Sequence, residues 1–237
     1  MSNAVTTRSL SGPLCCGMVQ RDCRFPRQHI AKRGFQKSVN WFEQQFHKHK
    51  DVCVFHSLWE LYYGVLLEID PKVTAFVPQP FLFQIGKFRY TPDFHLERQG
   101  HIYIVEIKRD QELNEDGQWN RKHITQSMFD YCAVQGWTFK VIANSWLKKQ
   151  QILVERWLPI IRCLQHHKEL ITDQQEITLL TQLNAVSHYQ LQDVINPMDR
   201  KNSLPMEIAL YRLALRGQIS LDIQHTALSP QSRIMLQ

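Results

Sequence analysis

Long apolar runs are missing from this chain of 237 residues: the longest stretches, such as Ile102–Val105, extend over only a few positions. A helix that spans a bilayer needs about 20 apolar residues, so the sequence predicts no membrane segment. No positively charged leader with an apolar run follows Met1, which argues against secretion. The apolar fraction of 43% is nevertheless ample for a packed core, and we expect a folded, cytoplasmic protein.

Cysteine pairs of the kind that bind metals or form dense disulfides are also absent. The six cysteines include no CxxC pair, which in a chain of this length indicates reduced thiols. A zinc site could be assembled from Cys15, Cys16, Cys23 and His29. Adjacent cysteines rarely complete one tetrahedron, so this alternative is disfavoured.

Acidic residues are scarce in the first 50 positions, where Asp22 and Glu43 stand against nine lysines and arginines. This segment carries a net charge of +7, so the remainder of the chain, whose total is +6, is close to −1. A basic segment on a near-neutral body is typical of proteins that bind nucleic acid. A solvated tail without a binding role explains the same charge equally well, and composition does not choose between them.

Apolar spacing and turn signals predict a mixed α/β region up to about residue 147. Ser57 is a favourable N-cap for a helix that Asp70-Pro71 ends, and Gly136 is typical of the residue that follows a helix. The expected elements, in chain order, are helices at Val39–His47 and Leu58–Ile69, an extended segment at Val73–Val77, strands at Phe81–Ile85, Phe88–Glu97 and His101–Lys108, a helix at Arg121–Gln135 and a strand at Trp137–Ile142. A meander of strands followed by a strand–helix–strand crossover is an α/β fold.

Helices dominate the pattern after about residue 147. The expected elements are helices at Gln151–Leu164, Asp173–Val186, Ser187–Ile195 and Pro205–Arg216, followed by a short strand at Gln218–Ile223. This order is the outline of a winged-helix module, although a helical lid on the first domain would give a similar pattern. We therefore divide the chain into a basic irregular arm (residues 1–37), an α/β domain (38–147) and a helical, winged-helix-like domain (148–237).

An acidic cluster is predicted at the open end of a β-hairpin. With Gln99-Gly100 as its two-residue turn, the strand register places Asp93 directly opposite Glu106. Directly opposed side chains lie about 5 Å apart at Cβ and point to the same face. Lys108 shares that face, whereas Ile107 points into the core and leaves its carbonyl oxygen near the cluster. Oxygen ligands of this kind suit Mg²⁺.

A surface hairpin could present the same residues as a solvated charge cluster. Glu106, however, directly follows a run that must be buried, and Pro92 stands where the strand can break. Two carboxylates that face each other at the end of a buried strand repel unless a cation lies between them. We therefore favour a functional site.

Pro92-Asp93 followed by Glu106-Ile107-Lys108 is the signature of PD-(D/E)xK nucleases, and the expected order αβββαβ resembles the core of that superfamily. Longer segments resemble the TnsA family, the endonuclease subunits of certain heteromeric cut-and-paste transposons. These segments are Phe55–Glu60, Leu67–Val73, Gln79-Pro80, Tyr90–Phe94 and Val105–Lys108. The resemblance covers roughly residues 35–145.

The resemblance implies roles for the clustered residues. Asp93 and Glu106 would bind Mg²⁺, with two ions expected and Mn²⁺ able to substitute, and the carbonyl oxygen of Ile107 would be a further ligand. Lys108 would orient or polarise the attacking water. Glu60 would be a fourth acidic residue at the metals, although the Ser-x-x-Glu pattern at the start of its helix is also that of a capping box.

Contacts with DNA are expected from basic residues around this site: Arg33, Lys37, Arg89, Arg121 and Lys122. The resemblance further implies that the protein cuts the 5′ strands of double-stranded DNA at transposon ends, at the bacterial nucleoid. A TnsB-like transposase would act on the 3′ strands, and a TnsC-like AAA+ ATPase would bind the C-terminal region. Two alternatives stay open: a stand-alone PD-(D/E)xK restriction or repair nuclease, and a non-catalytic adaptor that binds DNA and the ATPase.

Overall fold

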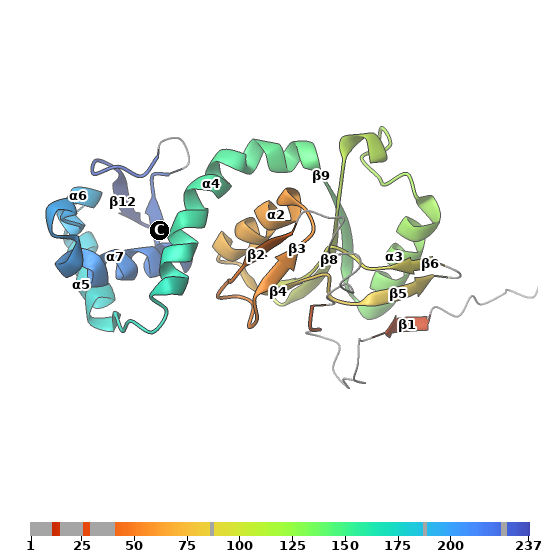
Figure 1. Cartoon of the computed structure of the whole chain (residues 1–237), viewed down its shortest axis with the longest axis horizontal. Coiled ribbons are helices and arrows are strands. Elements are labelled where there is room, and N and C mark those ends of the chain that lie inside the picture. The colour runs from red at the N-terminus through yellow and green to blue at the C-terminus, as the bar shows by residue number, and fades with distance from the viewer. Residues whose placement is uncertain (1–10, 15–25, 29–40, 86–87, 187–188, 224–226) are drawn as a thin grey trace, which may run out of the picture. The chain divides into compact units, whose positions relative to one another are not determined.

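The computed structural model describes residues 11–14, 26–28, 41–85, 88–186, 189–223 and 227–237 (Figure 1). The chain forms two compact units, and neither is continuous in sequence. The first consists of Met1–Phe42, Cys53–Glu60 and Thr74–Ser145. The second consists of Glu43–Val52, Leu61–Val73 and Trp146–Gln237, so it includes two segments from the N-terminal half of the chain.

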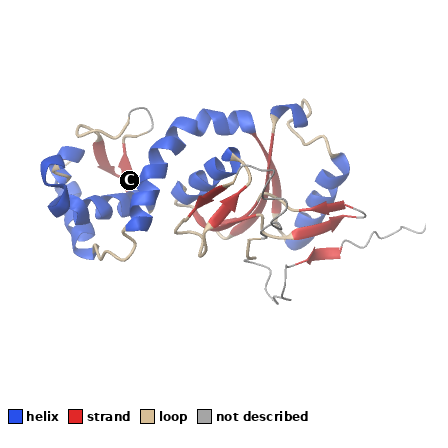
Figure 2. Ribbon diagram, viewed as in Figure 1, coloured by secondary structure: helices blue, strands red, loops and turns tan. Residues whose placement is uncertain are grey.

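A mixed four-stranded sheet forms the centre of the first unit (Figure 2). Its strands lie in the order β4 (Val73–Pro78), β7 (Phe94–Arg98), β8 (His101–Lys108) and β9 (Thr138–Ala143). β7 and β8 are antiparallel, whereas β8 and β9 are parallel. Helix α3 (Lys122–Gln135) makes the crossover between the two parallel strands, as the sequence predicts.

The β7–β8 hairpin has the predicted register. Arg98 pairs with His101 and Phe94 with Val105. The turn residues Gln99 and Gly100 have φ values of 53° and 76°, and positive φ at both positions is the requirement of a type I′ turn. Register and turn are thus confirmed, because a two-residue turn leaves the strands one way to pair.

Two predicted strands belong to a separate sheet instead of the central one. β5 (Leu82–Ile85) and β6 (Phe88–Tyr90) form an antiparallel hairpin, which β1 (Ser11–Leu14) joins at the edge. The single strand expected over Phe88–Glu97 is therefore wrong. It is interrupted at Thr91–Asp93, where Pro92 has no N–H to offer a strand ladder.

The helix expected over Val39–His47 is also wrong. Residues 39 and 40 lie outside the described part of the chain, and Phe42–Gln44 form strand β2, which pairs with β3 (Cys53–Phe55). The helical spacing of the aromatic residues in this segment is also compatible with a strand of only three residues. The strand that pairs with β2 is β3, which comes later in the chain.

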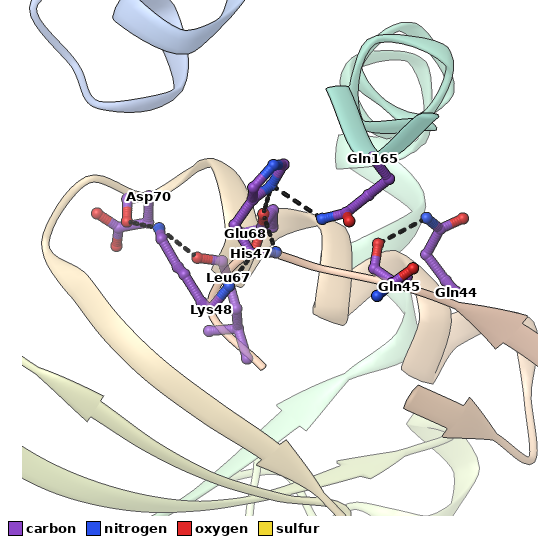
Figure 3. Close-up of polar contacts among 8 residues, drawn as sticks. All are labelled: Gln44, Gln45, His47, Lys48, Leu67, Glu68, Asp70 and Gln165. Atoms are coloured by element: carbon purple, nitrogen blue, oxygen red, sulfur yellow. Dashed lines mark hydrogen bonds and ion pairs between the residues drawn. The ribbon is translucent and has the colours of Figure 1, made fainter. Parts of the chain in front are cut away.

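A buried carboxylate holds the loop that follows β2 (Figure 3). Glu68, fully buried in helix α2 (Leu58–Ile69), accepts hydrogen bonds from the backbone nitrogens of His47 (2.8 Å) and Lys48 (3.2 Å). The Lys48 ammonium donates to the carbonyl oxygens of Leu67 (3.0 Å) and Asp70 (2.6 Å) at the end of α2. Backbone groups that a local helix would pair internally are thus bonded to another element, which is why the local pattern fails here.

The second unit contains helices α4 (Asn144–His166), α5 (Asp173–Ala185), α6 (Leu191–Val194) and α7 (Arg200–Leu215), and a sheet in the order β10 (Tyr189–Gln190), β12 (Arg233–Leu236), β11 (Ile219–Leu221). Short 3₁₀ turns occur at η1 (Asp110–Glu112) and η2 (Pro197–Asp199). Within the described residues, none of the helices combines the length and apolar character that a membrane span requires.

Several boundaries in this unit differ from the expected ones. Of the helix expected at Ser187–Ile195, residues 187 and 188 lie outside the described part of the chain, residues 189 and 190 form β10, and only α6 is helical. β12 lies in what the sequence suggests is a tail. Ile234 of β12 is fully buried, so burial at one position of a short strand orders it. α4 begins at Asn144 instead of Gln151. These boundaries depend on contacts between segments that are distant in sequence, and the apolar periodicity within one segment carries no information on such contacts.

Candidate active site

The predicted cluster forms at the open end of the β7–β8 hairpin. Asp93 directly precedes β7, in register with Glu106, and its Oδ2 atom accepts a hydrogen bond of 2.6 Å from the backbone nitrogen of Ile107. Lys108 forms an ion pair with Glu106 Oε1. Asp93, Glu106 and Lys108 therefore meet on one side of the sheet, as expected, while the side chain of Ile107 lies on the other.

Glu106 is the most enclosed carboxylate of the group, with an exposed fraction of 2%. Its second oxygen, Oε2, accepts a hydrogen bond from the hydroxyl of the buried Tyr90. The pKa of Glu106 is raised from 4.5 to about 8, first by burial and then by the charge of Asp93, although Lys108 and the hydrogen bond from Tyr90 partly oppose the rise. The Glu106 side chain is thus held from both oxygens at a position where its charge is costly.

Asp93 and Glu60 show the same electrostatic signature. The pKa of Asp93 is raised to about 7, first by burial and then by the charge of Glu60, against the opposing effect of Lys108. The pKa of Glu60, whose exposed fraction is 7%, is also raised, chiefly by burial with a contribution from the charge of Glu106, while hydrogen bonds from His56 and Ser57 oppose the rise. Three carboxylates therefore lie within electrostatic reach of one another, and each disfavours the ionisation of the others.

Glu60 also has the contacts of a helix cap. Its Oε1 atom accepts from the Ser57 hydroxyl (2.8 Å), and its backbone nitrogen donates to the Ser57 Oγ atom (3.1 Å). Its Oε2 atom accepts from the backbone nitrogen of His56 (3.1 Å), not from that of Ser57 as a capping box would have it. Glu60 can therefore cap helix α2 and lie beside the acidic cluster at the same time. The two roles that the sequence suggests for Glu60 do not exclude each other.

Trp119 is a member of the site that the sequence does not single out. The Lys108 ammonium lies 4.3 Å from the centre of its ring, at cation–π distance. Trp119 is buried and packs with Tyr90, at a ring separation of 5.9 Å, on the core formed by α3 and the sheet. For Lys108, burial lowers the pKa, but Glu106 and Asp93 outweigh it and the pKa is raised. The ammonium therefore stays charged.

The donor set fits a hard divalent cation by its chemistry. Within the described residues, no three His, Cys, Asp or Glu side chains are arranged as a ready-made metal cluster, and the carboxylates of Glu60, Asp93 and Glu106 accept hydrogen bonds from the protein. Buried carboxylates with raised pKa values are nonetheless groups whose charge an ion would compensate. The Ile107 carbonyl as a ligand stays a prediction.

The expected DNA contacts have different outcomes. Arg33 and Lys37 lie outside the described residues, as do the four residues of the disfavoured zinc site, Cys15, Cys16, Cys23 and His29. Arg89 belongs to β6. Arg121 and Lys122 are exposed at the start of α3, and the Arg121 guanidinium lies 5.7 Å from the Trp119 ring centre. Arg121 thus shares an aromatic neighbour with Lys108, which places a second cation close to the acidic cluster.

Stability should depend on pH through Glu106. Because its pKa is raised on folding, the folded state binds a proton that the unfolded state has released, so stability falls as pH rises from about 5 to about 8. The variant Glu106→Gln removes this titration and should lose less stability over that interval. Thermal denaturation at pH 5 and pH 8 in EDTA measures the difference, and about 1 kcal/mol moves Tm by about 2–4 °C in a chain of this size. Parallel pH profiles for the two proteins would contradict the assignment.

No protein-family model matches the chain, and no curated protein is significantly similar to it.

Proposed function

We propose that this protein is a metal-dependent DNA endonuclease of the PD-(D/E)xK type. The observation that carries the proposal is the meeting of Asp93, Glu106 and Lys108 at one end of a hairpin, with Glu60 within electrostatic reach. Two or three buried carboxylates beside a lysine are what phosphodiester hydrolysis needs to hold a metal and to handle a water. The element order around the central sheet, α2, β4, β7, β8, α3, β9, supports the same class.

The division of labour among the residues follows from their surroundings. Mg²⁺ would neutralise charge on the phosphate and lower the pKa of a bound water, and Mn²⁺ would be able to substitute for it. Asp93, Glu106 and Glu60 would hold it, with the Ile107 carbonyl as a further oxygen. Lys108 keeps its positive charge between the Glu106 carboxylate and the Trp119 ring, so it can orient the attacking water and stabilise the negative charge that develops.

DNA would be held by the basic residues near this site. Arg121 and Lys122 stand exposed at the N-terminus of α3, where backbone N–H groups and positive charge together attract a phosphate. Arg33, Lys37 and Arg89 belong to the same proposal. Contacts of this kind position a duplex without reading its sequence.

Within this class, the TnsA-like role is the specific proposal. The protein would cut the 5′ strands at transposon ends in the bacterial cytoplasm, with a TnsB-like transposase for the 3′ strands and a TnsC-like AAA+ ATPase. The helices of the second unit, as a winged-helix-like module, would bind the ATPase. Their hydrogen bonds show that this module should not be tested as a fragment cut near Lys148, since Tyr62 donates to Glu155 of α4 (3.0 Å) and Arg162 to Gln44 (3.1 Å).

The decisive experiment is cleavage of end-labelled duplex that carries the transposon ends. Reactions contain Mg²⁺ or Mn²⁺, with and without a TnsB-like transposase and a TnsC-like AAA+ ATPase. Strand-specific 5′ cleavage only in the complete mixture supports the TnsA-like role. Cleavage of unrelated DNA by the protein alone would favour a stand-alone nuclease, and the absence of cutting in every mixture would favour an adaptor.

Glu60 can be assigned by the variant Glu60→Gln, which keeps hydrogen-bonding capacity at the helix start but removes the negative charge. As a metal ligand, Glu60 should be needed for activity, and cleavage should fall by about 10- to 100-fold or more, with Tm nearly unchanged. The measurement is the initial cleavage rate across a Mg²⁺ titration. The matched variant Glu176→Gln changes an acid on α5 that hydrogen-bonds the Thr172 hydroxyl (3.0 Å), and it should cut normally. Normal cleavage by Glu60→Gln would make the residue a cap alone.

A further inference from the structure

Gln79 has an unfavourable backbone conformation next to the acidic cluster. Its φ is 46°, and among the described residues only Gln79 and Gln99 combine a side chain with positive φ. Gln99 is accounted for by the type I′ turn. Gln79 instead follows β4, is buried with 6% of its surface exposed, and precedes Pro80, a position that favours an extended backbone. Such strain persists where surrounding contacts enforce it, and it is common at functional sites.

The side-chain amide of Gln79 connects two groups at the start of α2. Its Nε2 atom lies 2.7 Å from His56 Nδ1 and 3.3 Å from Glu60 Oε2. An amide nitrogen has two hydrogens, so it can serve both acceptors if the His56 ring is neutral with its proton on Nε2. The Gln79 amide thereby adds a second donor to the Glu60 oxygen that also accepts from the His56 backbone nitrogen.

The backbone of Gln79 reaches a second member of the cluster. Its nitrogen donates a 2.8 Å hydrogen bond to the carbonyl oxygen of Asp93. The left-handed conformation lets one residue direct its N–H towards the chain before β7 and its amide towards α2. The two acidic residues come from elements far apart in the sequence, and Gln79 contacts both.

We propose that Gln79 is a positioning residue that sets the Glu60 carboxylate relative to Asp93 for metal binding. The inference rests on the proposed function and adds a specific role to it. Glycine would be the ordinary choice for this backbone conformation, and the glutamine side chain costs conformational strain that its contacts to Glu60 and His56 offset. The Gln79 amide contacts Glu60 and His56, so its effect on metal binding would be exerted through Glu60.

The test compares Gln79→Gly with wild type and with Gln99→Gly. Both substitutions relieve the same kind of backbone strain and keep the backbone N–H, but only the first removes the amide that holds Glu60. Gln79→Gly should fold with Tm equal to or above that of wild type. Its maximal cleavage rate should fall about 10- to 100-fold, and half-maximal rate should require more Mg²⁺. Duplex binding measured in Ca²⁺ should be unchanged. Gln99→Gly should match wild type in every reading except stability.

A second variant keeps the inference testable if Gln79→Gly is unstable. Gln79→Asn tolerates positive φ and retains an amide, but the shorter side chain cannot reach both acceptors, so the same shift in Mg²⁺ dependence is expected at intact stability. If either variant, when folded, cleaves at the wild-type rate with the wild-type Mg²⁺ dependence, Gln79 is a turn residue and the inference fails. Absence of cleavage by wild type itself would instead overturn the proposed endonuclease.

Discussion

Asp93→Ala and Glu106→Ala should each reduce Mg²⁺-dependent strand cleavage by more than about 100-fold, because even residues that only support metal ligands cost about 10- to 100-fold when replaced. Stability should not fall in parallel. Glu106 is buried and Asp93 is partly buried, each beside carboxylates of like charge that raise its pKa, so its removal relieves repulsion in the metal-free protein. Equal or higher Tm in EDTA together with lost activity is the expected pair of results.

Metal affinity is a further measurement that tests the variants Asp93→Ala and Glu106→Ala. Titration calorimetry with Mn²⁺ should show a site in wild type that is lost or strongly weakened in Asp93→Ala and Glu106→Ala. The matched control is Glu115→Ala, since Glu115 is an exposed acid in the loop after β8 and should behave as wild type. Cleavage by Asp93→Ala at the wild-type rate would remove Asp93 from the site and, with it, the proposed class of enzyme.

Lys108→Ala should lower the maximal cleavage rate by about 100- to 1000-fold, the usual cost of removing one group that stabilises charge in the transition state. Metal binding should persist, because an ammonium is not a metal ligand. Lys108→Arg should not restore activity: a planar guanidinium does not replace a compact ammonium at a shaped site, here between Glu106 and the ring of Trp119.

A lysine on the neighbouring strand serves as the control for Lys108. Lys140 of β9 is exposed, and its ammonium lies 4.5 Å from the ring centre of Tyr103. It pairs in register with Val105, so its side chain points to the opposite face of the sheet from Lys108. Lys140→Ala should cleave normally. If Lys108→Ala also retains at least half of the wild-type rate at saturating Mg²⁺, the lysine has a structural role and another group must handle the water.

The parts of the site that follow from local sequence are those within one hairpin. A two-residue turn at Gln99-Gly100 leaves one register, and alternation along a strand then decides which side chains share a face. Asp93, Glu106 and Lys108 are therefore predictable as neighbours without a structure. Gly136, with φ 69° at the end of α3, is predictable for the same reason, since a left-handed residue that ends a helix is a local requirement.

The errors occur where a segment exchanges its local partners for distant ones. Residues around Phe42 pair with β3 instead of forming a helix, and the loop beyond them is bonded to Glu68. β5 and β6 belong to a separate sheet, and the chain enters the central sheet only after Pro92, at β7. The apolar pattern of β5 and β6 is that of any half-buried strand, so it does not indicate which sheet they join. Periodicity reports that one face is buried, not which surface buries it.

The surroundings of the catalytic candidates depend on tertiary contacts in the same way. Trp119 comes from a loop whose sequence is mostly polar, and Gln79 from the end of β4. Their roles arise because the fold places an aromatic ring beside Lys108 and an amide beside Glu60. Strand register is decided by bonds between near neighbours, so residue order alone determines that Asp93, Glu106 and Lys108 are neighbours. The groups that enclose it, and the raised pKa values that follow, depend on burial, which only the packing of distant segments provides.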